Sequence, residues 1–184
     1  MNISVKQGSL TEVECDALII NLFEGVRVPG GGTGAVDKAL DGAISRQVAE
    51  EEFEGKLGEC MVIRPSVSFP ARKVVVVGLG KREGFGILEI LKAAAAAARK
   101  CQELKAAKVS SILHGAGIAG LPAYECARAV GLGTILGAYE FTRWKTENGK
   151  SHPIETFDII ELSQDKIADI RRGIDRAEII GEAV

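Results

Sequence analysis

Two glycine clusters are the segments of this sequence whose residue types and spacing suggest chemistry. The first glycine loop contains Gly30, Gly31 and Gly32, and the second glycine loop contains Gly115, Gly117 and Gly120. Glycine lets several backbone N–H groups converge on one anion, and a helix that begins at such a turn adds a partial positive charge. The chemistry predicted for both loops is phosphate binding, and the alternative is a tight strand-to-helix turn with no ligand.

The second glycine loop also matches the G-x-G-x-x-G pattern of dinucleotide-binding proteins. Glu140 lies about 20 residues further on, as does the acidic residue that contacts the ribose in such sites. That pattern belongs at the first strand-to-helix turn of a nucleotide-binding unit, whereas here it comes late in the chain and Glu140 falls within an expected helix. An oxidoreductase that uses a dinucleotide is therefore a disfavoured alternative.

Candidate nucleophiles and metal ligands are few and scattered. No two of the four cysteines form a C-x-x-C pair, and His114 and His152 form no H-x-x-x-H pair. This spacing predicts no zinc or iron site within the chain and no catalytic residue. The cysteines are instead expected to be small core residues in a reducing compartment. They are Cys15, Cys60, Cys101 and Cys126.

The chain of 184 residues has a mass of 19.5 kDa, and 46% of its residues are hydrophobic and 26% are charged. This balance predicts one globular domain and excludes an intrinsically disordered chain. The formal net charge of −2 gives no electrostatic basis for general nucleic-acid binding. No apolar run approaches the roughly 20 residues of a membrane span, and residues 1–6 do not resemble a signal peptide. We therefore expect a cytoplasmic protein with no membrane partner.

Apolar runs and helical periodicity alternate along the chain, which predicts how the glycine loops are positioned. Strands are predicted at residues 2–8, 16–23, 60–64, 73–77, 109–113 and 157–162. Helices are predicted from Thr33 as N-cap to Val48, at 87–108, at 121–143 and from Ser163 to Ile180. Gly42 is expected to weaken or break the first of these helices. The alternation is typical of an α/β fold with a mixed, mostly parallel sheet and helices on both faces.

The first glycine loop and its flanks resemble the macro-domain family. In Asp16-Ala17-Leu18-Ile19-Ile20-Asn21 an apolar strand ends in asparagine, and a glycine-rich loop and a helix follow, as in that family. The segment from Gly115 to Tyr124 resembles the second phosphate loop of the family. The resemblance implies a three-layer macro-domain-like fold in which both glycine loops would hold the phosphates of ADP-ribose or another nucleotide. The residues concerned are Gly30, Gly31, Gly32, Gly115, Gly117 and Gly120.

Three features depart from the macro-domain pattern. Ser9 occupies the place where the family has an aspartate that reads adenine, and a hydroxyl cannot replace that charge. Asn21 is followed by leucine and phenylalanine, so the second asparagine of the family is missing. Glu24 would bring a negative charge near a bound pyrophosphate and repel it. We therefore expect a macro-like fold whose ADP-ribose site has been lost, with a working nucleotide-phosphate module as the alternative.

The whole chain, residues 1–184, resembles the N-terminal domain of the leucyl aminopeptidase family, also called the cytosol aminopeptidase family. The similar stretches are Leu18–Leu40, Val74–Gly80, the alanine-rich helix from Ile87, Ala129–Thr146 and Ile174–Glu178, in the order they have in that family. The resemblance implies a single N-terminal domain that precedes a catalytic domain absent from this chain. In the family, the catalytic domain removes N-terminal amino acids from peptides with two divalent metals, manganese or zinc.

The same resemblance implies that this chain by itself is not catalytic. A two-metal centre needs clustered carboxylates, whereas the acidic stretch Glu50–Glu54 is expected to be a solvated helix face. The implied partners are the catalytic domain of the same polypeptide and the other subunits of a hexamer, with a role in assembly or regulation. Some bacterial members bind DNA through this domain. Here acidic neighbours cancel the charge of Arg171, Arg172 and Arg176, which makes DNA a disfavoured partner.

Overall fold

A six-stranded sheet forms the centre of the protein in the computed structural model, which describes residues 1–50, 53–118, 120–139 and 152–183. The strands are β1 (Asn2–Gln7), β2 (Ala17–Leu22), β3 (Cys60–Ile63), β4 (Val74–Gly78), β5 (Lys108–Ile112) and β6 (Thr156–Glu161). They lie in the order β1-β6-β5-β2-β4-β3. β3 runs antiparallel to β4, and every other neighbouring pair is parallel. The sheet is therefore mixed and mostly parallel, as the sequence predicts.

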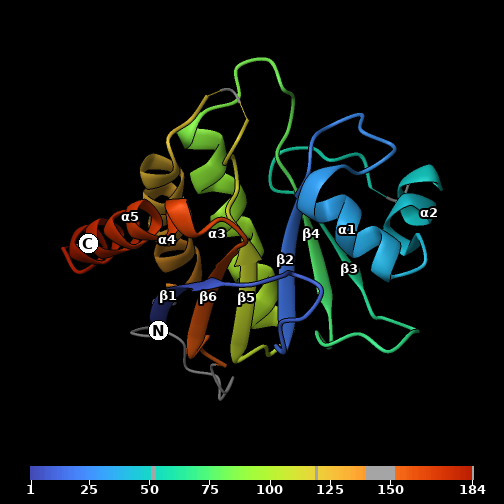
Figure 1. Ribbon diagram of the computed structural model, residues 1–184, viewed down its shortest axis with the longest axis horizontal. Helices are drawn as coiled ribbons and strands as arrows, with labels where there is room; N and C mark the ends of the chain where they lie inside the picture. The colour runs from blue at the N-terminus through green and yellow to red at the C-terminus, as the bar shows by residue number, and fades with distance from the viewer. Residues whose placement is uncertain (51–52, 119, 140–151, 184) are drawn as a thin grey trace, which may run out of the picture.

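Five helices cover the two faces of the sheet within the described residues (Figure 1). They are α1 (Gly31–Ala39), α2 (Ala43–Ala49), α3 (Ile87–Glu103), α4 (Ala123–Ala138) and α5 (Gln164–Gly181). The helices α3, α4 and α5 pack on one face, whereas α1 and α2 cover the half of the other face that β2, β3 and β4 form. This arrangement confirms the predicted three-layer α/β fold with helices on both faces.

The central strands β2 and β4 are buried on both faces, which explains their unbroken apolar sequences. Side chains alternate along a strand, so Ile19 and Val75 join the core beneath α3, α4 and α5. Leu18 and Val76 point the other way, into the core beneath α1 and α2. All four side chains are at most 1% exposed. Burial of both faces is the usual environment of parallel strands that helices flank.

Several glycines serve helix packing rather than ligand binding. A β-carbon at Gly137 of α4 would overlap backbone atoms of Ala95 in α3, and one at Gly133 would overlap the carbonyl of Leu91. Gly173 of α5 is similarly close to the carbonyl of Tyr124 at the start of α4. The three helices can approach one another this closely because their contact positions lack side chains. Part of the high glycine content is therefore explained by one helical layer.

The break predicted at Gly42 is confirmed, and its cause lies in two residues. Gly42 has a φ of 77°, a left-handed conformation that turns the chain between α1 and α2. The Asp37 carboxylate in α1 then accepts hydrogen bonds from the N–H groups of Ile44 and Ser45, at 2.8 and 3.1 Å. A side chain of one helix thus satisfies the free N–H groups at the start of the next.

Three predicted helix limits are wrong. The helix predicted at 121–143 ends at Ala138, because the backbone of the next residue, Tyr139, is extended. Thr33 does not cap α1, because Gly30 is the N-cap and Thr33 lies within the first turn, where its hydroxyl bonds to the end of β2. The helix predicted to reach Lys108 ends at Glu103. Lys105 adopts a φ of 57°, which reverses the chain so that β5 begins at Lys108. The differences at Thr33 and Lys108 arise because neighbouring strands fix where the chain must turn.

Candidate functional site

The two glycine loops meet at one cavity. The first loop follows β2 and the second follows β5, and these strands are parallel neighbours, so both loops emerge at the same edge of the sheet. We call the space between them the glycine-loop cavity; it has a volume of about 330 Å³ and is lined by parts of residues 21–33 and 112–118 together with Arg82. Crevices outside the carboxyl ends of parallel strands are the usual ligand sites of α/β proteins.

The predicted phosphate-binding glycines divide into two groups. Gly30, Gly31, Gly32 and Gly115 line the glycine-loop cavity. Gly117 and Gly120 belong to the second loop but are not among the lining residues. Both have positive φ values, 76° and 67°, so the backbone turn alone accounts for glycine at these positions. The structure therefore brings together only part of the predicted set.

The first glycine loop has the geometry of an anion-binding turn. The first hydrogen bond of α1 runs from the Gly34 N–H to the Gly30 carbonyl, at 3.0 Å, so the N–H groups of residues 31–33 are available to a ligand or to water. A β-carbon at Gly30 or Gly31 would meet no atom within 4 Å. Gly30 also has an ordinary extended backbone, with a φ of −119°. Internal packing therefore does not account for glycine at position 30.

In the second glycine loop the protein interior dictates glycine at Gly115, as it does at Gly32 of the first loop, where a β-carbon would lie 2.8 Å from the Ile112 side chain. Gly115 has a φ of 84°, and a β-carbon there would overlap the Ile90 side chain of α3. The Ile118 N–H donates to the Gly115 carbonyl at 3.0 Å, which closes a turn. A tight strand-to-helix turn therefore accounts for Gly115 in the second glycine loop. Only the position of Gly115 on the wall of the cavity favours a ligand there.

Asn21, the last polar residue of β2, connects the two loops. Its backbone carbonyl accepts a hydrogen bond of 2.8 Å from the Thr33 hydroxyl, directly after the first loop. Its side-chain Nδ2 lies 3.0 Å from Nδ1 of His114, directly before the second loop. His114 is buried, and burial lowers the pKa of its imidazole to about 4. No local pattern indicates a partner for His114, because Asn21 lies 93 positions away along the chain.

Glu24 was expected to bring a negative charge near a bound pyrophosphate, but it does not line the glycine-loop cavity. Glu24 lines a neighbouring cavity with Arg27 and Glu54, not the glycine-loop cavity. The charged residue that lines the glycine-loop cavity is Arg82, whose guanidinium lies 4.7 Å from the centre of the Phe23 ring. A cation held over an aromatic face in this way retains its charge for an anion. Arg82 is exposed, and its position on the wall of the cavity is a finding of the structure.

Ser9 lies in a smaller cavity of about 220 Å³ that adjoins the glycine-loop cavity and shares Gly32 with it. The Ser9 hydroxyl forms a hydrogen bond of 2.8 Å with the Thr11 hydroxyl. Glu161 also lines this cavity, but one of its carboxylate oxygens accepts from the Ser163 N–H at 3.0 Å and the other lies 3.7 Å from Lys166. The place of the missing aspartate is thus occupied by a short polar side chain.

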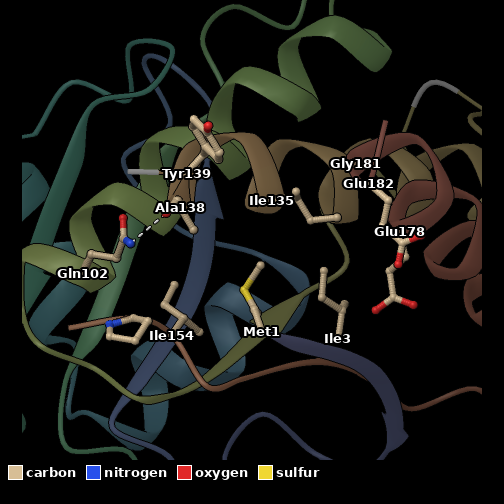
Figure 2. Close-up of a pocket in the computed structure, with 11 residues that line it drawn as sticks. Met1, Ile3, Gln102, Ile135, Ala138, Tyr139, Ile154, Glu178, Gly181 and Glu182 are labelled. Carbon is tan, nitrogen blue, oxygen red and sulfur yellow. Dashed lines mark hydrogen bonds between the residues drawn. The ribbon is translucent and has the colours of Figure 1, made fainter. Parts of the chain in front are cut away.

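A larger cavity, of about 440 Å³, lies near the starts of β1 and β6, far from the glycine loops in the sheet (Figure 2). Met1 and Ile3 point into it, and Glu178 and Glu182 of the α5 end lie on one side. On the opposite side Gln102 donates a hydrogen bond of 2.9 Å to the Ala138 carbonyl. The apolar floor and the two like charges suggest no small-molecule chemistry.

Metal-ligating side chains do not cluster in the described part of the chain. No group of three or more His, Cys, Asp or Glu is placed there to hold a metal ion, so a two-metal centre does not fit these residues. Cys15, Cys101 and Cys126 are buried, as the sequence predicts, and Cys60 is half-buried. Burial raises the pKa of the Cys60 thiol to about 11, which opposes a role as nucleophile.

Other predictions from the sequence concern acidic residues, the arginines of α5 and membrane spans, all outside the cavities described above. Glu51, Glu52 and Glu140 lie outside the described residues, so the structure does not place the acidic stretch as a whole or the acidic residue of the dinucleotide pattern. On α5 the Arg172 guanidinium pairs with Asp169 at 3.0 Å, which agrees with the expected cancellation of charge. No helix within the described ranges is long and apolar enough to cross a membrane.

Residues 19–148 match the family model described as "Cytosol aminopeptidase family, N-terminal domain". The chain is 31% identical over 153 residues to a probable cytosol aminopeptidase of Alkaliphilus oremlandii, covering 82% of this chain and 30% of that protein. It is 33% identical over 174 residues to the probable cytosol aminopeptidase of Nostoc punctiforme, covering 91% and 34%. The chain thus spans about a third of the length of these relatives.

Solved structures of two kinds of protein, a leucine aminopeptidase and a macrodomain, have the same fold. A mutant of tomato leucine aminopeptidase superposes with a TM-score of 0.78 at 25% identity, over 99% of this chain and 36% of that one. A Trypanosoma brucei macrodomain in complex with ADP superposes with a TM-score of 0.72 at 17% identity, over 94% and 69%. The second similarity concerns the fold alone, and it confirms the macro-domain-like architecture.

Proposed function

Because this chain belongs to the cytosol aminopeptidase family and corresponds to its N-terminal domain, we propose that it is a non-catalytic domain that serves assembly or regulation of a longer leucyl aminopeptidase. The longer protein would remove N-terminal amino acids from peptides in the cytoplasm. Its catalytic domain, on the same polypeptide, would carry two divalent metals, manganese or zinc, and the full protein would form a hexamer. The observation that carries the proposal is that the chain spans only about a third of its relatives.

Exposed apolar side chains support a role in assembly. Leu136 and Tyr139 at the end of α4 are 38% and 66% exposed, and Ile179 near the end of α5 is 58% exposed. Tyr139 and the end of α5 both border the large cavity in Figure 2. Tyr139 thus offers an exposed apolar surface beside this cavity for contact with another domain or subunit.

Two measurements test this proposal. The purified chain is incubated with a chromogenic leucine substrate and Mn²⁺ or Zn²⁺, and we expect no hydrolysis, because the described residues provide no cluster for two metals. The reading frame after the codon for Val184 is then sequenced, and we expect it to encode clustered Asp and Glu residues and a lysine. Hydrolysis by the chain alone would overturn the non-catalytic role, and a stop codon directly after Val184 would overturn the longer enzyme.

A second candidate function is a module that binds ADP-ribose or another nucleotide phosphate in the glycine-loop cavity. The observation that favours it is the joint lining of this cavity by the first glycine loop and Arg82, with open space over Gly30 and Gly31. Glu24, which was expected to repel phosphate, lines another cavity. Free N–H groups and a cation in one crevice are the usual partners of a phosphate.

Calorimetry with ADP-ribose, and separately with ADP, tests the second candidate. We expect micromolar affinity that falls when Gly30 is replaced by valine, because the branched side chain would fill the space over the first loop. Gly86→Val serves as the matched control, since Gly86 has a φ of −158° and the nearest atom to a β-carbon there is a Glu89 carboxylate oxygen at 3.7 Å. Gly86 also lines none of the cavities described above. No binding at millimolar ligand would reject this candidate and leave the first.

A further inference from the structure

The Asn21 carboxamide lies between the glycine-loop cavity and the buried His114 ring. Asn21 lines the cavity, and its Nδ2 lies 3.0 Å from Nδ1 of His114. An amide nitrogen can donate a hydrogen bond but cannot accept one, so Nδ2 is the donor and Nδ1 the acceptor. The contact therefore fixes which end of the carboxamide faces the ring.

This hydrogen bond also fixes the proton of His114. An acceptor at Nδ1 requires the neutral ring with its one proton on Nε2. Burial favours the neutral ring as well, since it lowers the pKa of His114 to about 4. Nε2 is buried and has no hydrogen-bond partner among the described residues. The ring therefore has one polar contact within the described structure, and that contact is with Asn21.

The other end of the Asn21 carboxamide is consequently free to contact a ligand. The oxygen Oδ1 diverges from Nδ2 on the planar amide, so it is turned away from His114. The Thr33 hydroxyl bonds to the backbone carbonyl of Asn21 and not to its side chain. No hydrogen bond to Oδ1 forms within the described part of the chain. A hydrogen-bond acceptor is thus left at the end of β2, where Asn21 lines the cavity.

We infer that His114 is a positioning residue that holds Asn21 with Oδ1 presented to the glycine-loop cavity, where it accepts a hydrogen bond from a ligand hydroxyl. The inference rests on the second candidate function and deepens it. The N–H groups of the first loop and Arg82 favour an anion, whereas an amide oxygen repels one and favours a donor. One molecule satisfies both demands when it carries a phosphate and a neighbouring hydroxyl. The substrate class is therefore a phosphorylated sugar or the sugar end of a nucleotide.

The first experiment needs no ligand. Long-range ¹H–¹⁵N NMR spectra of the chain at pH 7 report which imidazole nitrogen of His114 carries the proton. We expect the proton on Nε2 in the native protein. In Asn21→Asp the partner of Nδ1 becomes a carboxylate oxygen, which can only accept, so the proton should move to Nδ1. A native ring protonated on Nδ1, or a tautomer that does not change in Asn21→Asp, would overturn the inference.

The second experiment compares two phosphate probes by NMR titration. Ribose 5-phosphate offers hydroxyl donors, and methyl phosphate offers none. In His114→Ala we expect the affinity for ribose 5-phosphate to fall about tenfold, the value of one good hydrogen bond, with the affinity for methyl phosphate unchanged. His114→Gln retains an acceptor oxygen for Asn21 and should restore most of the loss. A dispersed amide spectrum establishes that each variant is folded.

The outcomes separate this inference from the function on which it rests. If both probes bind and both lose affinity equally in His114→Ala, the phosphate pocket stands and the positioning role is rejected. If methyl phosphate and ribose 5-phosphate bind with equal affinity to the native chain, the hydroxyl selectivity is rejected. If neither probe binds, the nucleotide-phosphate function fails and the ligand class fails with it, while the tautomer measurement still decides the role of His114.

Discussion

The Thr33 hydroxyl donates a hydrogen bond of 2.8 Å to the backbone carbonyl of Asn21. This contact fastens the first turn of α1 to the end of β2, and Thr33 itself is only 3% exposed. The first glycine loop is therefore held at both ends by β2, once through the chain and once through this hydroxyl. Its geometry is set by the fold and does not depend on a ligand.

Replacing Thr33 by valine should lower the free energy of unfolding by about 1 kcal/mol, because the shape is kept and one buried hydrogen bond is lost. Thr134→Val is the matched control. Thr134 is fully buried in α4, but its hydroxyl has no partner among the described residues, so the same change there should be neutral or stabilising. Urea unfolding measures both values. Equal losses in the two variants would show that the Thr33 contact contributes nothing.

Gly137→Ala should destabilise the protein by about 1–3 kcal/mol, because the new methyl group overlaps backbone atoms of Ala95 and forces α4 away from α3. Gly30→Ala should change stability little, since its β-carbon would meet open space and its φ is −119°. Thermal or urea unfolding compares the two substitutions. A large loss in Gly30→Ala would indicate an internal packing role for the first glycine loop.

Stability should fall with decreasing pH through the titration of His114. Its pKa is lowered from 6.5 in the unfolded chain to about 4 in the fold, so between these values the unfolded state binds a proton that the native state excludes. The contribution is complete above pH 6.5, and about 3 kcal/mol is lost on going down to pH 4.

Comparing unfolding at pH 7.5 and 4.5 isolates this contribution. His114→Gln should lose less stability over that interval than the native chain, because it has no imidazole to protonate. His152→Gln is the control, since it removes an exposed imidazole and leaves the buried one in place. The same pH dependence in all three proteins would contradict the assignment to His114.

Thiol reagents should react slowly with the native chain. Burial raises the pKa of the Cys60 thiol to about 11, so only about one molecule in 10³ carries the thiolate at pH 8. The rate at Cys60 should rise about tenfold for each pH unit below 11 while the fold persists. Absorbance with a chromogenic disulfide measures the rate, and urea should expose all four cysteines. Rapid native reaction at pH 7 would show an activated cysteine instead.

Local patterns predicted those elements whose own residues decide their structure. The four valines of residues 74–77 form a strand because it is buried on both faces, and the alanine-rich helix begins at Ile87 as expected. The limits of elements were less predictable. The sequence suits a helix up to Lys108, but the chain must reverse near Lys105 so that β5 can pair with β2 and β6.

The candidate site was only partly predictable for the same reason. The first glycine loop was identified from its residues, because three successive glycines follow an apolar strand and precede a helical pattern. Arg82 was not identified, since nothing adjacent in the sequence indicates that it lies over the Phe23 ring and lines the cavity. Gly115 looked like a ligand-binding glycine, whereas Ile90 of α3 is the neighbour that excludes a side chain there.

The sequence by itself determined the fold class, the family resemblance and the presence of two glycine loops after apolar strands. These follow from periodicity, composition and motif order, which are local properties. Only the tertiary structure decided that β2 and β5 are neighbours, and hence that Asn21 meets His114 across 93 positions of the chain. Hydrogen bonding depends on distance and direction in space, and no local pattern specifies the strand order that sets them. Strand order therefore determines which glycines share a cavity and which polar atoms remain for a ligand.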